Sequence, residues 1–451
     1  MTEDTIAAIA TAPGEGGVSI VRMSGPEAES IMTRLFRPAG KAKGALASHM
    51  LTYGRVMDGG MPVDECMAVI MRAPRSYTRE DVCEFQLHGG GYACHRVLDM
   101  CLAAGARLAE PGEFTRRAFL NGRIDLSQAE AVMALISARG EQAHRAAMRQ
   151  LDGGASLFIR QAADELYGIQ AGVAACIDYP EEVDEAEAAA DLSPRISRLR
   201  GMLADACDER AARLTSAGLT VALCGRPNVG KSSLLNALLG EDRAIVTEIP
   251  GTTRDTVPGD LVLGGCLIHL TDTAGIRDTD DPVEKLGVAR SAKALDQADA
   301  VVLVLDGGQP LQAEDRALIE RIRGRNVLVA LNKSDLPPVV TDGDAAALLP
   351  GTPVFRLSAR IAASLTPLKA RLQTMASVTD QLALTQPRHL DAARRAAEHL
   401  GQALDALSQG MSVDFVSVDL QAAQAALSEI TGDRADEKLL DQVFSSFCVG
   451  K

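Results

Sequence analysis

The chain has 451 residues with 47% hydrophobic side chains, which is enough for several globular cores and excludes a disordered protein. No stretch approaches the roughly 18 apolar residues of a membrane-spanning helix. The nine scattered cysteines form no CxxC pair, so we expect a reduced, cytoplasmic protein without membrane contact, and the net charge of −14 requires any nucleic acid to bind a local basic patch.

The first 118 residues mix short runs of β-type residues with glycine-rich turns. Strands are predicted over 5–11, 18–23, 65–72 and 82–86. Residues 119–213 instead carry apolar side chains, many of them alanine, at helical spacing. We therefore expect an α+β domain at 1–118, followed by the first part of a helical domain at 119–213.

Residues 214–380 alternate strands with helices, which is the pattern of a doubly wound parallel sheet. The strands are predicted over 220–224, 266–271, 300–305, 326–331 and 354–357. Helical spacing returns over 389–409, 418–431 and 436–447. The economical interpretation is a multidomain α/β and all-α protein, in which an inserted domain at 214–380 interrupts a helical domain made of 119–213 and 381–451. Two separate helical domains are the alternative.

A phosphate-binding loop is predicted at 225–232, where GRPNVGKS fits the pattern G-x-x-x-x-G-K-[ST] between a strand and a helix. Its glycines let backbone N–H groups surround the phosphates, Lys231 supplies positive charge, and the Ser232 hydroxyl is a ligand for Mg²⁺. The residues expected to bind here are Asn228, Val229, Gly230, Lys231, Ser232 and Ser233.

Two motifs downstream are typical of the γ-phosphate side of a GTPase site. In DTAG, Asp272 ends a strand near the metal, and the N–H of Gly275 lies near the γ-phosphate. Thr252 and Thr253 lie on the intervening switch segment, and of the two we expect Thr253 to bind Mg²⁺. The contacts expected on this side come from Thr247, Thr252, Thr253, Asp272, Thr273, Ala274 and Gly275.

The base side is predicted from an NKxD motif made of Asn332, Lys333 and Asp335. The Asp335 carboxylate can accept hydrogen bonds from the ring N–H and the amino group of guanine, a donor pair that adenine lacks. Ser358 and Ala359 end the last strand, where a backbone N–H meets the guanine carbonyl. In this order, the motifs predict a Ras-like P-loop GTPase domain that binds GTP rather than ATP.

The position that orients the attacking water in Ras-like enzymes is a Gln directly after the DxxG glycine. Here that position is Ile276, whose side chain cannot do so. Besides Lys231 at the phosphates, the catalytic groups must therefore come from elsewhere. A metal ion, Asn228 and a carboxylate downstream are the candidates.

With these motifs and their flanks, the chain resembles the MnmE/TrmE family of tRNA-modification GTPases over essentially its whole length. The stretches that carry the resemblance are 5–13 with 16–18 and 21–26 (VRMSGP), 77–90 (YTREDVCEFQLHGG), 111–131 (PGEFTRRAFLNGRIDLSQAEA), 244–255 and 447–451 (FCVGK). Five such stretches in one order argue against an accidental match.

The resemblance implies a folate-binding and dimerising domain at 1–118, a discontinuous helical domain, and a potassium-stimulated G domain that is activated when two G domains of a homodimer meet. It also implies an FAD-dependent partner of the GidA/MnmG type, which forms a hetero-oligomer with this chain. Together the two proteins add a carboxymethylaminomethyl or aminomethyl group to carbon 5 of the tRNA wobble uridine.

The resemblance also implies ligands for a potassium ion, which takes the place of an arginine finger. These are Asn228 and the main-chain oxygens of Thr247, Ile249 and Thr252. Glu284 matches the family's water-orienting glutamate. Its alternative interpretation is an exposed residue at the start of a helix after Pro282.

Four residues match the family's contacts with a tetrahydrofolate derivative, which carries a formyl or methylene group: Arg22, Glu84, Arg123 and Lys451. Arginine or lysine pairs with the glutamyl tail, and Glu84 with the pterin amino groups. Cys448 is either a nucleophile or proton carrier beside the folate, or a packing residue on an apolar helix end near two phenylalanines.

Three positions depart from the family pattern. Arg123 stands where lysine is usual, which keeps the charge and changes its geometry. Arg79 replaces a usual glycine, and residues 360–363 lack the familiar polar, glycine-containing run beside the base.

Two other classes of GTPase have to be weighed. A ribosome-assembly GTPase would act as a binding switch without folate chemistry, and it has no use for the four folate-matching residues or for Cys448. A structural GTPase of the dynamin type would need a membrane-binding amphipathic stretch, and the sequence has none.

Overall fold

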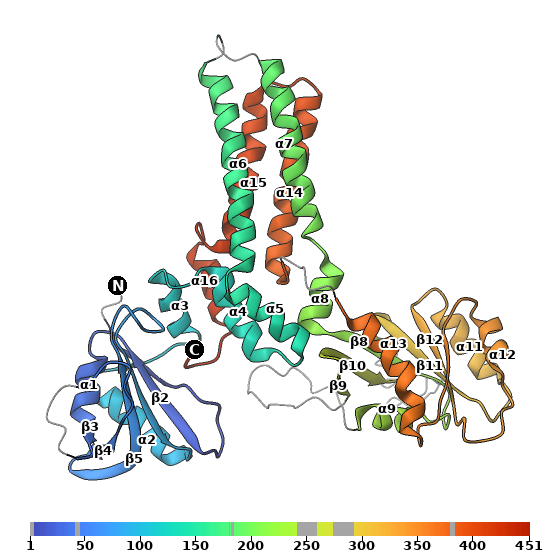
Figure 1. Cartoon of the computed structure of the whole chain (residues 1–451), viewed down its shortest axis with the longest axis horizontal. Helices are drawn as coiled ribbons and strands as arrows, with labels where there is room; N and C mark the ends of the chain where they lie inside the picture. The colour runs from blue at the N-terminus through green and yellow to red at the C-terminus, as the bar shows by residue number, and fades with distance from the viewer. Residues whose placement is uncertain are drawn as a thin grey trace, which may run out of the picture. The chain divides into compact units, whose positions relative to one another are not determined.

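The computed structural model describes residues 4–40, 46–179, 181, 185–240, 259–273, 293–378 and 384–451. The chain divides into two compact units (Figure 1). One unit contains Met1–Met133, Gln150–Ala204 and Ala392–Lys451, and the other contains Ala134–Arg149 and Asp205–Asp391. Within the described parts, no helix is both long enough and apolar enough to cross a membrane.

The first unit begins with a sheet of order β3-β4-β5-β6-β2-β1-β7. Neighbouring strands are antiparallel except β1 and β7, which are parallel. The strands are β1 Ile6–Ile9, β2 Val18–Ser24, β3 Phe36–Pro38, β4 Thr52–Asp58, β5 Met61–Met71, β6 Val82–His88 and β7 Arg107–Leu108. In the β2–β6 pair, Arg22 lies directly opposite Glu84.

Two helices, α1 Ala28–Leu35 and α2 Gly91–Ala103, pack on this sheet. Their buried residues join the alternate, inward-facing side chains of the strands in one apolar core. This alternation is the period-2 pattern that predicts strands from sequence. Strand β4 was not predicted, because Gly54 interrupts its β-type residues. The structure requires that glycine, since a Cβ there would lie 2.4 Å from the carbonyl oxygen of Arg37 on β3.

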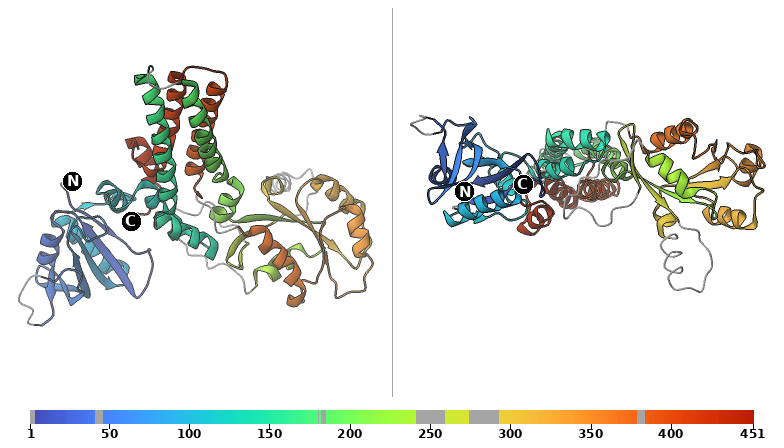
Figure 2. Two further views of the ribbon diagram at one scale, coloured as in Figure 1. Left: turned by 45° about the horizontal axis from the view of Figure 1, so that its top comes forward. Right: turned by 90° about the horizontal axis from the view of Figure 1, so that it is seen from below.

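The helical part of the first unit follows the sheet. Helices α6, α7, α14 and α15 run side by side, although the first two precede the second sheet in the chain and the last two follow it (Figures 1 and 2). Of the shorter helices, α3 and α4 precede these four in the chain and α16 follows them. The bounds are α3 Glu113–Leu120, α4 Leu126–Ser137, α6 Gly154–Asp178, α7 Glu185–Asp205, α14 Pro387–Ser408, α15 Val413–Thr431 and α16 Glu437–Phe444.

The second unit is built on a sheet of order β13-β12-β11-β8-β10-β9, parallel except for the antiparallel pair β9–β10. The strands are β8 Leu219–Cys224, β9 Asp260–Leu263, β10 Cys266–Asp272, β11 Ala300–Asp306, β12 Val327–Asn332 and β13 Val354–Arg356. The strands β8, β11 and β12 are buried on both faces, as expected for central strands of a parallel sheet.

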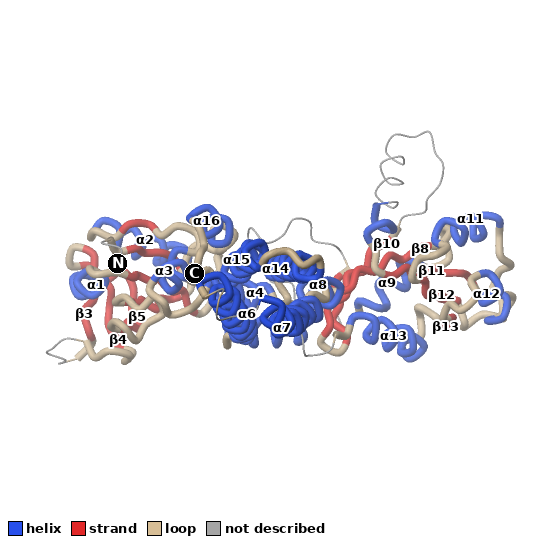
Figure 3. The backbone as a smooth tube through the Cα atoms, turned by 90° about the horizontal axis from the view of Figure 1, so that it is seen from above, coloured by secondary structure: helices blue, strands red, loops and turns tan. Residues whose placement is uncertain are grey.

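Helices lie on both faces of the second sheet (Figure 3). Alternate strand residues feed two separate apolar clusters: one packs against α9 and α13, and the other against α11 and α12. The helices of this unit are α5 Glu141–Leu151, α8 Glu209–Ala217, α9 Lys231–Leu239, α11 Ala313–Ile322, α12 Asp342–Leu348 and α13 Thr366–Ala376, with a 3₁₀ turn at Ala362–Leu365.

The structure confirms the predicted fold class, a doubly wound P-loop domain inserted in a helical protein that begins with an α+β sheet domain. Two details of the prediction are wrong. The short strands β3, β7 and β9 were missed, because two to four residues carry too little periodicity to be recognised. The last helix ends at Phe444 and not at 447, so Cys448 lies in the turn beyond it and not on a helix end.

Candidate functional site

The phosphate-binding loop lies between the end of β8 and the start of α9. Gly230 has a φ of 94°, and a Cβ at this position would lie 2.4 Å from the Nδ2 atom of Asn332. Only glycine therefore fits, because the loop must pass this close to the NKxD motif. Asn228 also adopts a left-handed conformation, with φ 65°, and its side chain is exposed.

Lys231 is buried at the bottom of this loop. Its ammonium group donates to the carbonyl oxygens of Gly225 at 2.8 Å and Arg226 at 3.1 Å, both within the loop. Burial lowers the pKa of Lys231, while Asp272 acts in the opposite direction. Loop carbonyls therefore hold the lysine at the position from which it can reach phosphate oxygens.

Ser232 and Asp272 form the candidate Mg²⁺ site. The Ser232 hydroxyl donates to Oδ2 of Asp272 at 2.8 Å. The other oxygen of Asp272, Oδ1, is buried and has no hydrogen-bond partner among the described residues. A buried carboxylate oxygen without a donor fits a hard cation, because Mg²⁺ binds one or two carboxylates together with phosphate oxygens and water.

The NKxD motif joins the base side of the site to the phosphate loop. Asn332 donates through Nδ2 to the carbonyl of Val229 at 2.9 Å, and its Oδ1 accepts from the N–H of Ala359 at 3.1 Å. Lys333 donates to the carbonyl of Asn228 at 3.0 Å and pairs with Asp306 at 2.7 Å. The NKxD motif therefore holds the phosphate-binding loop in place, in addition to its predicted role in binding guanine.

Asp335 lies at the mouth of the base site. A hydrogen bond from the Ser358 hydroxyl, at 2.6 Å, lowers its pKa, and a backbone hydrogen bond adds to this effect. The carboxylate is therefore ionised and can accept two donors from guanine. Arg360 lies 3.9 Å from the other carboxylate oxygen and lines the same pocket, although no motif predicted a role for it.

These groups line one pocket of about 620 Å³, which is large enough for a nucleotide. The predicted residues that line it are Asn228, Gly230, Lys231, Ser232, Ser233, Asn332, Lys333, Asp335, Ser358 and Ala359. Two predicted contacts face elsewhere: Val229 is buried in the core, and the Thr273 hydroxyl donates to the carbonyl of Leu223 on β8. The predicted residues Thr247, Ile249, Thr252, Thr253, Ala274, Gly275 and Glu284 lie outside the described residues.

Arg226 is the arginine of the phosphate loop. Its guanidinium donates to Oε1 of Gln309 at 2.8 Å and lies 3.4 Å from the Asp315 carboxylate. Both partners lie at or beside the start of α11, and the Arg226 side chain is largely buried there. Its positive charge is thus directed to α11, and the described contacts leave the loop without an arginine aimed at the phosphates.

The predicted folate contacts meet in the first unit. Arg22 on β2 and Glu84 on β6 form a largely buried ion pair of 2.7 Å, because the strand register places them side by side. Arg22 also donates to the carbonyl of Gly450 at 3.3 Å. Gly450 directly precedes Lys451, and burial together with the positive charge of Arg22 lowers the pKa of Lys451. Residues 428 positions apart in the chain therefore share one site.

Arg123 joins this cluster through Tyr77, which the sequence analysis did not single out. Arg123 donates to the Tyr77 carbonyl at 3.2 Å, and its guanidinium lies 4.7 Å from the centre of the Tyr77 ring. The guanidinium of Arg22 lies 5.9 Å from the same ring. Tyr77 falls within the stretch that carries the family resemblance, which was the available signal. We call Arg22, Tyr77, Glu84, Arg123 and Lys451 the folate-site cluster.

Cys448 is half-buried in the turn that leads to Lys451. Its carbonyl accepts hydrogen bonds from the N–H groups of Gly112 and Lys451, each at 3.3 Å. The rings of Phe444 and Phe447 pack against each other at 5.4 Å and supply the apolar core here. Cys448 is not a member of that core cluster.

Comparisons with known proteins cover both units. Residues 5–123 match the family model "GTP-binding protein TrmE N-terminus", and residues 126–448 match "MnmE helical domain". Among curated relatives, proteins named tRNA modification GTPase MnmE are 47% identical in Symbiobacterium thermophilum and 46% in Syntrophotalea carbinolica, each over 100% of both chains. The Lactiplantibacillus plantarum relative of that name is 44% identical over 99% of this chain and 98% of its own. The predicted resemblance is confirmed, and the chain belongs to the MnmE family of tRNA modification GTPases.

Proposed function

We propose that this protein is a potassium-stimulated GTPase that works as a homodimer with an FAD-dependent partner of the GidA/MnmG type. Together they add a carboxymethylaminomethyl or aminomethyl group to carbon 5 of the tRNA wobble uridine. The observation that carries this proposal is the convergence of Arg22, Glu84 and Lys451, which come from distant parts of the chain. The domain division at 118, 213 and 380 is part of the proposal.

In the nucleotide site, Lys231 binds phosphate oxygens and Asp335 binds guanine. Ser232, Asp272 and Thr253 are the proposed ligands of Mg²⁺, which would offset negative charge on the phosphates. Glu284 orients the water that attacks the γ-phosphate. Because Arg226 is directed to α11, the additional positive charge comes from a potassium ion held by Asn228, Thr247, Ile249 and Thr252.

In the folate-site cluster, cationic side chains outnumber carboxylate side chains: Arg22 pairs with Glu84, Lys451 follows the residue whose carbonyl Arg22 binds, and Arg123 lies against the Tyr77 ring. This excess fits a ligand with carboxylates, such as the glutamyl tail of a tetrahydrofolate carrying a formyl or methylene group. We assign Glu84 to the pterin amino groups and the arginine and lysine side chains of the cluster to the glutamyl tail, with Cys448 as the nucleophile or proton carrier.

The test is the nucleoside composition of tRNA from cells that lack the gene. Total tRNA is digested and analysed by mass spectrometry, before and after complementation with the wild-type gene. We expect the C5-substituted wobble uridine to disappear in the deletion strain and to return on complementation. An unchanged nucleoside profile in the deletion strain would refute the proposed function.

A further inference from the structure

Tyr77 lies on a short segment, residues 77–80, that leads into β6. We call it the Tyr77 segment. It is held mainly by α3 and the turn after it. The Tyr77 hydroxyl lies 2.9 Å from Oγ1 of Thr115 on α3, and Nδ2 of Asn121 donates to the carbonyl of the next residue, Thr78, at 2.7 Å. Helix α3 therefore determines where the Tyr77 ring lies.

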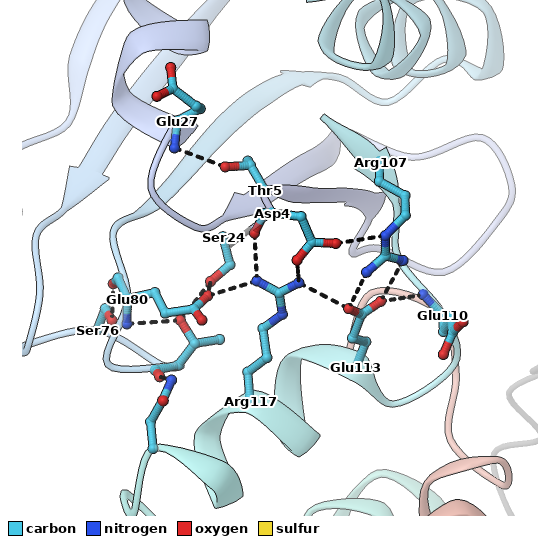
Figure 4. A network of polar contacts seen from close by, with 12 residues as sticks. Asp4, Thr5, Ser24, Glu27, Ser76, Glu80, Arg107, Glu110, Glu113 and Arg117 are labelled. Carbon is cyan, nitrogen blue, oxygen red and sulfur yellow. Dashed lines mark hydrogen bonds and ion pairs between the residues drawn. The ribbon is translucent and has the colours of Figure 1, made fainter. Parts of the chain in front are cut away.

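The strongest attachment between α3 and this segment is Arg117, whose side chain is 2% exposed. Its Nη1 donates to Oε2 of Glu80 at 3.1 Å and to the carbonyl of Asp4 at 3.0 Å (Figure 4). Its Nη2 donates to the carboxylates of Asp4 at 2.8 Å and Glu113 at 3.0 Å. One buried guanidinium thus joins α3, the Tyr77 segment and Asp4, which lies just before β1.

Glu80 extends this attachment to β2. Its Oε2 also accepts from the hydroxyl of Ser24, the last residue of β2, at 2.7 Å. The Ser24 hydroxyl lies 2.6 Å from that of Thr78, and both of these side chains are fully buried. Arg117, Glu80, Ser24 and Thr78 therefore form a continuous polar chain. Removing Arg117 would break a buried ion pair with Glu80, which is strongly unfavourable.

The consequence for the folate-site cluster follows from the position of the Tyr77 ring. The guanidinium groups of Arg22 and Arg123 lie 5.9 Å and 4.7 Å from the centre of this ring. The negative face of an aromatic ring attracts both cations. Without the ring in this position, Arg22 and Arg123 lose the aromatic contact that they share, and their positive charges repel each other.

We propose that Arg117 is a positioning residue for the folate site: through Glu80 it fixes the Tyr77 segment, so that Tyr77 holds Arg22 and Arg123 in the geometry that binds the ligand. Arg117 itself does not touch the ligand. This inference rests on the proposed folate function. It adds to that function a buried device, made of residues from α3 and β2, on which the affinity for folate depends.

The experiment measures the dissociation constant for 5-formyltetrahydrofolate by titration calorimetry, together with thermal unfolding and GTP hydrolysis of the full-length protein. The variants are Arg117→Lys and, as the matched control, Arg116→Lys. Arg117→Lys keeps the positive charge but loses the two nitrogens of the guanidinium that bind Asp4, Glu80 and Glu113 at once. Arg116 is the neighbour on α3 and pairs with Asp441 at 3.2 Å, away from the Tyr77 segment. We expect the dissociation constant to rise at least about 10-fold in Arg117→Lys and to stay within about 2-fold in Arg116→Lys, with GTP hydrolysis unchanged in both.

A purely structural Arg117 would lower the unfolding temperature and leave the affinity of the folded protein unchanged, and that result overturns the inference. Tyr77→Phe and Thr115→Val provide a test that does not disturb the buried charges, because each removes one side of a single hydrogen bond. If α3 positions Tyr77 through this hydrogen bond, each single variant raises the dissociation constant for 5-formyltetrahydrofolate. The double variant then raises it no further than the single variant with the larger effect. Wild-type affinity in both single variants contradicts the role of Tyr77. No binding to the wild type refutes the folate function itself, and the inference with it.

Discussion

The Ser358 hydroxyl donates a hydrogen bond of 2.6 Å to Oδ1 of Asp335. The two residues lie 23 positions apart, after β13 and β12 respectively, and the adjacent ends of these parallel strands bring them together. The bond orients the carboxylate and keeps it ionised, so guanine meets an acceptor that is already in place.

Replacing Asp335 with Asn is expected to weaken GTP binding by at least about 100-fold, because a site that loses its acceptor pair rejects the donor pair of guanine. Xanthosine triphosphate, which presents a carbonyl in place of the amino group, should then bind better than GTP. Competition binding of the two nucleotides checks this. Asp342→Asn, which changes an exposed aspartate paired with Arg356, is the control. Unaltered GTP affinity in Asp335→Asn would remove Asp335 from base recognition.

Potassium is expected to raise the rate of GTP hydrolysis strongly over sodium, because Arg226 is directed to α11 and leaves a positive charge to be supplied. A missing arginine-finger charge is worth roughly 10³–10⁵ in rate. Asn228→Ala should abolish the potassium response and keep GTP binding, whereas the exposed Asn236→Ala on α9 should behave as wild type. Single-turnover hydrolysis in the two salts is the measurement. Equal wild-type rates in both salts would exclude the potassium mechanism.

His269 is expected to make stability depend on pH. Its Nδ1 lies 2.6 Å from the Asp260 carboxylate and its Nε2 lies 2.7 Å from the Ala217 carbonyl. Both partners are acceptors, so both nitrogens must carry protons. The Asp260 hydrogen bond raises the pKa of His269, although burial and Arg139 act against it. This stabilisation is complete below the ordinary pKa near 6.5 and is lost as pH rises through the higher folded value.

Unfolding temperatures measured from pH 6 upward therefore should fall more steeply for the wild type than for His269→Gln. The control is His144→Gln, which changes an exposed histidine on α5 and should keep the wild-type slope. If wild type and His269→Gln give parallel curves of unfolding temperature against pH, the imidazole does not donate hydrogen bonds from both nitrogens in the folded protein.

Cys448→Ser is expected to abolish tRNA modification while changing the free energy of unfolding by less than about 0.5 kcal/mol, since Cys448 is half-buried and lies outside the apolar core. Cys207→Ser, at the other half-buried cysteine, should leave modification intact. The assay is the wobble-uridine content of tRNA after complementation, with unfolding followed in parallel. A modified tRNA pool with Cys448→Ser would make Cys448 a packing residue.

The nucleotide site could be predicted from sequence because its parts are local. The phosphate loop, the NKxD motif and the Ser358 turn each follow a strand, and the carboxyl ends of parallel strands meet at one edge of the sheet. The predicted order of strand, loop and helix is confirmed, since β8 ends at Cys224 and α9 begins at Lys231. Val229 and Thr273 were the exceptions, since the Val229 side chain packs in the core and the Thr273 hydroxyl donates to the carbonyl of Leu223 on β8.

The roles of Tyr77 and Arg117 could not be predicted in this way. Both depend on contacts between segments far apart in sequence, as in the 113 positions between Arg117 and Asp4. In the sequence, a buried arginine on a helix cannot be distinguished from an exposed one. Its burial depends on carboxylates that other elements of the fold supply. The four residues proposed to contact folate were identified only through the family resemblance, and no local pattern connects them.

The pairing of β2 with β6 restricts which insertions and deletions this protein can accept. Side chains alternate between the two faces of a sheet, so a gain or loss of one residue within either strand would turn Arg22 and Glu84 to opposite faces. The turn between β4 and β5 obeys no such rule, since it can lengthen without moving the register of β2 and β6. We therefore expect length variation among relatives to gather in that turn, and the two strands to keep a constant length.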